Sequence, residues 1–149
     1  KPLNIFGRNS ASGTYGFFKE NALKKGDFRD SVKEQPGSAG VVQGIAEDRY
    51  AIGYSGIGYV TSGVRAVAIA AKDGGTAYPA DYDSVMADTY PLGRYLNLYI
   101  NKAPNKPLAP IVKEFCELIF SREGQSVVEK SGFLPLNEKL CAKERAKLQ

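Results

Sequence analysis

The chain has 149 residues, of which 43% are hydrophobic, and its 20 basic and 16 acidic side chains give a formal net charge of +4. These proportions are ordinary for a globular domain, and no apolar run approaches the roughly 18 residues that span a membrane. Histidine is absent, which excludes serine–histidine nucleophile pairs, histidine general bases and most transition-metal sites. We therefore expect neither a metal nor a cofactor.

The first element is a short strand at residues 3–6, which runs into small and polar residues at 7–14. A helix follows, because apolar residues recur at three- and four-residue spacing from Tyr15, and Gly26 is a stop signal. This strand–loop–helix unit is the most informative part of the sequence.

A second helix is predicted from Val41 to Glu47, with Ser38 as its N-cap. Strands are predicted at residues 51–54 and 64–71, and the second is apolar nearly throughout, as expected for a strand buried on both faces. A further strand is predicted from Tyr95 to Ile100. Strands that alternate with helices indicate an α/β fold with a mostly parallel sheet flanked by helices.

The C-terminal part reads as helical. An apolar stripe predicts a helix over residues 111–119, and Ser121 is expected to cap the next helix, which ends before Gly132. A terminal helix is predicted from Leu140 to Leu148. Its basic residues are interrupted by glutamates at helical spacing, which favours a solvated face over a nucleic-acid-binding stripe. We expect no nucleic-acid partner.

The only two cysteines are Cys116 and Cys141. They are too few and too far apart in sequence for a zinc ligand set. Two buried thiols and one disulfide remain equally compatible with the sequence, and a disulfide would require an oxidising compartment.

The loop after the first strand has the donors that a small oxyanion needs. A helix N-terminus presents unpaired N–H groups and a partial positive charge. Gly13 lets the backbone approach a ligand, Ser12 and Thr14 add hydroxyl groups, and the planar fork of Arg8 can grip two oxygens of a tetrahedral anion. An ordinary capped helix after a strand remains the alternative interpretation of these residue types.

The same loop does not match two kinds of catalytic site. It lacks the Gly-Lys-Ser/Thr ending of a nucleotide-binding P-loop. Ser10, Ser12 and Thr14 are poor candidates for catalytic nucleophiles, because the chain has no histidine and no lysine in a recognisable Ser-x-x-Lys frame. The residues therefore favour binding over catalysis.

Five segments, in order, give the chain a family resemblance. They are GRNSASGT (residues 7–14), PGSAGVV (36–42), AIGY (51–54), YPLGRYL (90–96) and SREGQ (121–125). Together they resemble the periplasmic or lipoprotein phosphate-binding proteins that serve ABC transporters, in the type II periplasmic-binding-protein family. The first segment is fairly specific to phosphate binders, whereas the last recurs across many solute-binding proteins.

The resemblance implies a two-lobed, hinge-closing fold that buries the anion between its lobes. It implies side-chain bonds to phosphate from Arg8 and Ser12, and main-chain N–H donors at Gly13 and Thr14. Many members have an aspartate where this chain has Ser10, and that aspartate accepts the proton of hydrogen phosphate. Ser10 can accept a hydrogen bond without adding negative charge, which weakens the usual argument for rejecting sulfate. Ser38 is a further candidate phosphate contact, with a structural N-cap as the alternative.

The resemblance also implies a domain organisation. Residues 3–90 correspond to the anion-binding lobe, and residues 91–149 to a return crossing, a strand and C-terminal helices. Family members begin with another lobe, so we expect that N-terminal lobe to be missing from this chain and the fragment alone to bind phosphate weakly or not at all. The implied partners are inorganic phosphate, that lobe and an ABC transporter permease. The implied location is the periplasm or the extracellular face of the cytoplasmic membrane, where some members carry a lipid anchor.

Three other functions are compatible with the sequence. One is a carrier for sulfate, molybdate or tungstate. Another is a phosphoester-processing enzyme, for which Asp81, Asp83 and Asp88 form the only compact acidic group. A surface adhesin or sensor subunit is compatible with the same fold. We expect a carrier of inorganic phosphate and no enzymatic activity.

Overall fold

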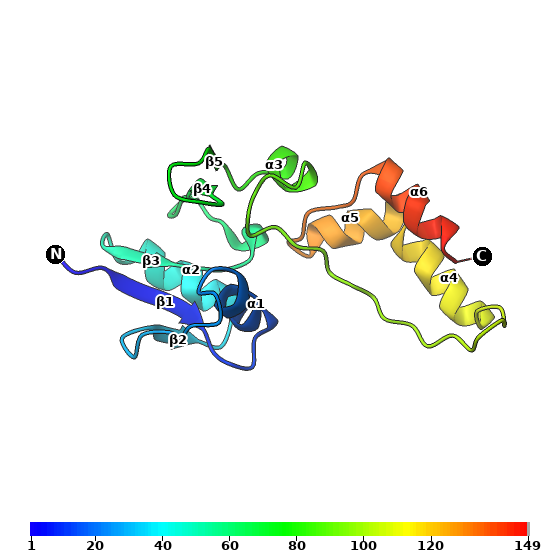
Figure 1. Cartoon of the computed structure of the whole chain (residues 1–149), viewed down its shortest axis with the longest axis horizontal. Coiled ribbons are helices and arrows are strands. Elements are labelled where there is room, and N and C mark those ends of the chain that lie inside the picture. Colours follow the sequence, from blue (N-terminus) through cyan, green and yellow to red (C-terminus); the bar gives the residue numbers. More distant parts are fainter. Residues whose placement is uncertain (149) are drawn as a thin grey trace. The chain divides into compact units, whose positions relative to one another are not determined.

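A computed structural model describes residues 1–148, and these divide into two units, Lys1–Arg94 and a second that starts at Tyr95. The first unit is built on strand β1 (Asn4–Arg8), which pairs in parallel with β2 (Lys33–Gln35) on one side and with β3 (Ala51–Gly53) on the other (Figure 1). The α/β fold with a parallel sheet flanked by helices, which the sequence predicts, is confirmed.

Two helices connect these strands. Helix α1 (Gly13–Asn21) leads from β1 to β2, and helix α2 (Ser38–Ala46) leads from β2 past β1 to β3. Because the chain first moves to one side of β1 and then to the other, the two right-handed crossings place the helices on opposite faces of the sheet.

Side-chain contacts agree with that placement, since successive residues of a strand point to opposite faces. The ring of Phe6 lies against α2, so closely that a Cβ added to Gly44 would overlap it. Gly7 points the other way, where a Cβ would lie 3.0 Å from the ring of Tyr54. Tyr54 in turn stacks on Phe18 of α1, with ring centroids 4.1 Å apart and the planes 9° from parallel. The strand β1 is therefore covered by α2 on one face and by an aromatic cluster on the other.

The rest of the first unit has little regular structure. It contains a short 3-10 helix η1 (Ile57–Tyr59), an antiparallel pair β4 (Ile69–Ala70) and β5 (Ala77–Tyr78), and helix α3 (Tyr82–Met86). The prediction of a buried strand over residues 64–71 is wrong. Only Ile69 and Ala70 pair, and Val67 is 50% exposed. In the part of the chain that the structure describes, no other strand lies beside residues 64–68 to complete a backbone ladder.

The second unit contains helices α4 (Pro110–Ile119), α5 (Arg122–Lys130) and α6 (Glu138–Ala146). Its buried residues Leu108, Cys116 and Leu148 form a small core. The predicted cap of α5 is confirmed, because the Ser121 hydroxyl oxygen accepts a hydrogen bond from the N–H of Gly124 at 3.1 Å. No helix within residues 1–148 has both the length and the hydropathy to cross a bilayer.

The structure of the second unit settles the state of the two cysteines and the conformation of residues 95–100. Cys116 and Cys141 are both buried and are free thiols, not a disulfide. The predicted strand from Tyr95 to Ile100 is wrong, since these residues have no regular structure and Tyr99 is 88% exposed. A strand needs a neighbouring backbone, and residues 1–148 supply none for this segment.

Candidate functional site

The candidate site lies at the carboxyl edge of the sheet. Arg8 and Gln35, the last residues of β1 and β2, are register partners, and each strand is followed by a short loop and a helix. In open α/β sheets, ligands bind outside the carboxyl ends of the strands, at the point where the chain reverses its direction of travel across the sheet. Here β1 is that point, because the chain proceeds from it to β2 and then to β3.

The loop after β1 ends in a well-formed helix cap. Ser12 has extended backbone angles and its hydroxyl oxygen accepts a hydrogen bond from the N–H of Thr14 at 3.1 Å. The N–H of Ser12 donates to the carbonyl of Asn9 at 3.1 Å, which closes the turn that contains the exposed Ser10. The Ser12 hydroxyl still has its own proton to donate. The Thr14 N–H, by contrast, is already engaged in this structure.

Arg8 is held in place by the start of α2. Its Nη1 donates to the hydroxyl oxygen of Ser38 at 2.8 Å, and its Nη2 donates to the carbonyl of Pro36 at 3.1 Å. Its Nε is buried and has no hydrogen-bond partner among residues 1–148. Leaving a buried charged donor unpaired costs on the order of 1–3 kcal/mol or more. The guanidinium is thus oriented by two bonds, while its buried Nε makes no hydrogen bond to residues 1–148.

The structure corrects the prediction that Ser38 caps α2. Gly37 is the N-cap, and it makes no side-chain capping bond. Ser38 is already the first helical residue, and its buried hydroxyl is engaged by Arg8 instead. Its carbonyl accepts a hydrogen bond from the hydroxyl of Ser55 at 3.2 Å. The structure therefore brings Ser38 and Arg8 together, although they are 30 positions apart in sequence.

The electrostatics of this edge are one-sided. Neither α1 nor α2 has an acidic residue in its first turn, where a carboxylate would normally stabilise the positive end of the helix dipole. Arg8 forms no ion pair with any residue the structure describes. A cation beside two uncompensated helix N-termini leaves an excess of positive charge and of donors, which an oxyanion would complement.

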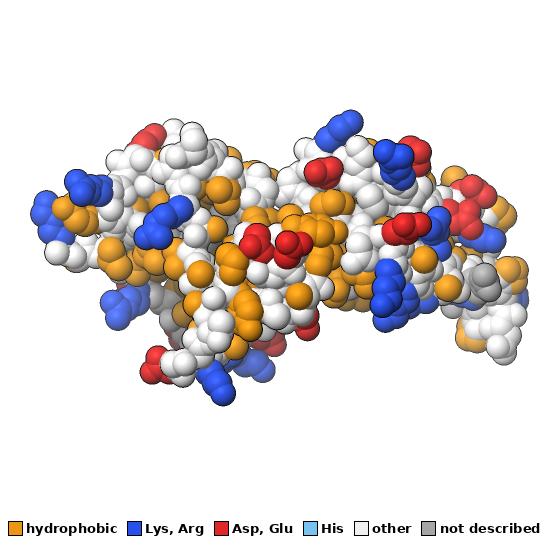
Figure 2. Space-filling view, turned by 90° about the horizontal axis from the view of Figure 1, so that it is seen from above, with side chains coloured by type: hydrophobic (Ala, Val, Ile, Leu, Met, Phe, Trp, Pro, Cys, Tyr) orange, Lys and Arg blue, Asp and Glu red, His pale blue; other side chains and the backbone are white. Residues whose placement is uncertain are grey.

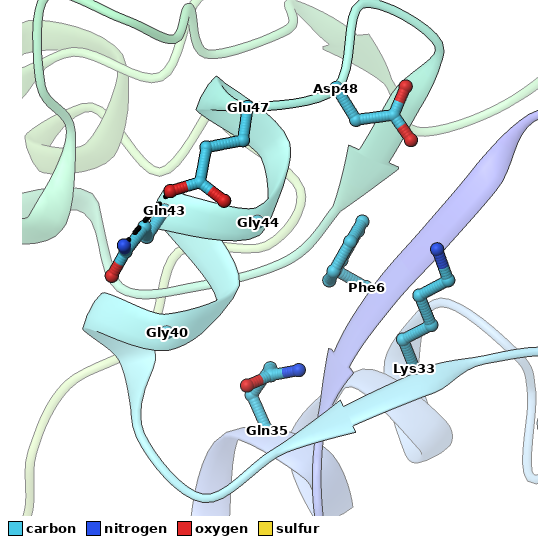
Figure 3. Close-up of a pocket in the computed structure, with 8 residues that line it drawn as sticks. All are labelled: Phe6, Lys33, Gln35, Gly40, Gln43, Gly44, Glu47 and Asp48. Carbon is cyan, nitrogen blue, oxygen red and sulfur yellow. Dashed lines mark hydrogen bonds between the residues drawn. The ribbon is translucent and has the colours of Figure 1, made fainter.

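A groove of about 400 Å³ on the α2 face is a poorer candidate for anion binding. Figure 3 shows Glu47 and Asp48 at this groove together with Lys33, and Gln43 hydrogen-bonded to Glu47. Two carboxylates against one ammonium give the groove no excess of positive charge. No cluster of three or more histidine, cysteine or acidic side chains suited to a metal occurs within residues 1–148.

Asp81, the first residue of the acidic group, has a structural role. Its carboxylate caps α3 by accepting a hydrogen bond from the N–H of Ser84 at 2.8 Å. This backbone bond and a side-chain bond from Ser84 lower the pKa of Asp81.

Tyr54 supports the site in a way the sequence does not reveal. Its hydroxyl accepts a hydrogen bond from the N–H of Arg8 at 3.2 Å and lies 3.4 Å from the carbonyl of Arg8, to which it donates. Burial raises the pKa of Tyr54, so its proton is retained at neutral pH. An aromatic residue just past a strand end gave no signal of this contact, because the partner is 46 positions away.

Replacing Tyr54 by phenylalanine tests this support. The ring and its stacking on Phe18 are retained, and only the hydroxyl bonds to the Arg8 backbone are lost. We expect the free energy of unfolding to fall by about 1 kcal/mol. Chemical denaturation followed by circular dichroism measures it, with Tyr59→Phe as the control at an exposed tyrosine. Equal stabilities for the two variants would contradict the role.

The chain is similar in sequence to proteins named as phosphate-binding proteins. The chain is 53% identical over 143 residues to the phosphate-binding protein PstS of Pseudomonas aeruginosa, an alignment that covers 96% of this chain and 44% of that protein. It is 29% identical over 144 residues to phosphate-binding protein PstS 2 of Streptococcus agalactiae, covering 91% and 46%. The chain thus spans less than half the length of these curated relatives.

Solved structures and a family model complete the comparison. A phosphate-binding protein of a phosphate ABC transporter from Streptococcus pneumoniae superimposes with a TM-score of 0.66 at 27% identity, covering 90% of this chain and 51% of that one. A possible phosphate binding protein from Planctomyces limnophilus, at 20% identity and a TM-score of 0.61, shares the fold. The family model described as the PBP superfamily domain matches residues 1–123. This confirms the resemblance found in the sequence motifs, and the chain belongs to the PBP superfamily-domain family.

Proposed function

We propose that this chain contains the anion-binding lobe of an extracytoplasmic carrier that captures inorganic phosphate for an ABC transporter. The observation that carries the proposal is the Arg8 guanidinium, oriented by Ser38 and Pro36 while its buried Nε lacks a partner among the described residues. The names of the relatives support phosphate as the anion. In this proposal the chain binds its ligand without chemical turnover, as the names of its relatives describe binding proteins.

The residues we assign to the phosphate are those at the carboxyl edge of the sheet. Arg8 and Ser12 donate from their side chains, Gly13 and Thr14 from the first turn of α1, with Ser10 and Ser38 beside them. Thr14 also donates through its hydroxyl, because its N–H is shared with Ser12. These donors act at a helix N-terminus, where an anion is stabilised by the dipole as well as by the hydrogen bonds.

A second lobe, in our proposal, supplies donors to the far side of the anion. The curated relatives are more than twice as long as the matched region, which supports this. Hydrophobic side chains are visible on the face shown in Figure 2, and several large ones are exposed in the second unit. The exposed ones there include Leu96, Tyr99, Ile111, Phe115 and Leu118. The other partner is the permease of the transporter, on the outer side of the cytoplasmic membrane.

Isothermal titration of phosphate into the two-lobed protein and into residues 1–149 alone tests the proposal. We expect micromolar or tighter binding by the two-lobed protein. Affinity should be at least about 100-fold weaker for the single lobe, because charge-assisted bonds from the other lobe contribute roughly 1.5–3 kcal/mol each. Tight binding to residues 1–149 alone would show that one lobe holds the whole site, and no binding to the two-lobed protein would overturn the function.

Sulfate is the informative competitor, because Ser10 has no negative charge with which to reject an anion that carries no proton. We expect sulfate not to displace phosphate from the wild-type two-lobed protein, and Ser10→Asp to sharpen that preference further. Displacement by equimolar sulfate would move the function to a carrier of another oxyanion and leave the fold unaffected.

A further inference from the structure

Arg94 lies on the first turn of α1, although it is 81 positions from Gly13 in sequence. Its guanidinium carbon is 4.8 Å from the centre of the Phe17 ring, and its Nη1 donates to the carbonyl of Gly13 at 3.4 Å. A Cβ on Gly13 would lie 3.9 Å from its Nη2. Arg94 directly follows a tight turn, in which the N–H of Gly93 donates to the carbonyl of Tyr90 at 3.0 Å.

This placement is electrostatically unfavourable for an unliganded helix. A cation near the first turn is repelled by the positive end of the helix dipole, and α1 has no acidic residue there to offset it. Arg94 forms no ion pair with residues 1–148. Stacking on Phe17 and the bond to Gly13 hold it there. A bound anion at the helix N-terminus would remove the repulsion.

We propose that Arg94 is a positioning residue for anion capture, which fixes the first turn of α1 through Gly13 and Phe17 and adds positive charge to the approach. The proposal rests on the function proposed above. It implies reciprocity: if Arg94 tightens anion binding, then a bound anion tightens the contact of Arg94 with α1 by the same factor.

Three variants of the two-lobed protein separate the contributions. Arg94→Gln removes the charge, Arg94→Lys keeps the charge without the planar fork, and Arg65→Gln removes an equal charge from an exposed position of the same unit. We expect Arg94→Gln to weaken phosphate affinity about three- to tenfold, as the loss of one exposed cation–π contact with its charge predicts. It should also slow phosphate association at low salt, whereas Arg94→Lys should keep the association rate and dissociate faster.

Amide hydrogen exchange in the first turn of α1 gives a readout that needs no phosphate. We expect faster exchange in Arg94→Gln than in wild type and Arg65→Gln, and added phosphate to slow it in wild type. Faster exchange with unchanged affinity would make Arg94 merely structural and overturn the proposal. Lower affinity with unchanged exchange would show that Arg94 does not act by fixing the first turn of α1, which would overturn its positioning role. If wild type binds no phosphate, the proposed function fails, and so does the role of Arg94 in phosphate capture; exchange then reports only its packing.

Discussion

Replacing Arg8 by alanine is expected to weaken phosphate binding by the two-lobed protein roughly 10- to 100-fold. The guanidinium is a charged group held at the carboxyl edge of the sheet by Ser38 and Pro36, and charge-assisted hydrogen bonds contribute on the order of 1.5–3 kcal/mol each. Since each factor of ten corresponds to about 1.4 kcal/mol, losing one such bond gives that range. Isothermal titration measures it directly.

The controls for Arg8 separate charge from geometry. Arg8→Lys keeps the charge but cannot bond Ser38, Pro36 and a ligand with one planar fork, so we expect an intermediate loss. Arg65→Ala, at an exposed arginine of the same unit, should leave the affinity unchanged. Unfolding midpoints for each variant show whether the start of α2 survives. A loss below about threefold in Arg8→Ala would remove Arg8 from contact with the anion.

The second large effect is expected in stability. Gly53 of β3 is the register partner of Phe6 in β1, and a Cβ at this position would overlap the carbonyl oxygen of Phe6. Since that oxygen belongs to the backbone of the central strand, no side-chain rotation can relieve the overlap. We expect Gly53→Ala to lower the free energy of unfolding by about 3 kcal/mol, the upper end of the typical cost of overpacking, because the β1 and β3 backbones must move apart. Urea denaturation measures the change.

Gly16→Ala is the matched control for Gly53→Ala. Gly16 lies inside α1, and no heavy atom would come within 4 Å of its new Cβ. Alanine is favoured over glycine in a helix interior, so the substitution should stabilise the protein by roughly 0.5–1 kcal/mol. If Gly53→Ala instead costs less than about 1 kcal/mol, the pairing of β1 with β3 described above is wrong.

The local features of this protein were predictable from its sequence. The unit of strand, polar loop and helix over residues 3–23 corresponds to β1 and α1, and the Ser121 cap and α4 also lie where they are predicted. Caps and helical periodicity depend on residues three or four positions apart, so a single sequence contains them in full. The hydrogen-bond donors from Arg8 to Thr14 could also be recognised in the sequence, because they lie within seven consecutive residues.

Strands were harder to predict, because a strand needs a partner that the local sequence does not contain. The short β2 was missed, since Lys33–Gln35 has little apolar character, yet it pairs with β1 in register. Residues 64–68 and 95–100 have strand-like composition but no neighbouring strand among residues 1–148. Backbone N–H and C=O groups that find no ladder remain in irregular, solvated structure.

The sequence by itself supplied the prediction of an anion site, through the grouping of Arg8, Ser12, Gly13 and Thr14 at one helix start. Only the tertiary structure decided which distant residues hold Arg8 and Gly13 in position. Ser38 binds the Arg8 side chain instead of capping α2, Tyr54 holds the Arg8 backbone, and Arg94 lies on Gly13. These contacts join residues 30, 46 and 81 positions apart, and the crossing of β1 by the chain brings the first two pairs to one edge of the sheet. Such separations leave no periodic pattern in a sequence, because the geometry of the whole sheet sets them.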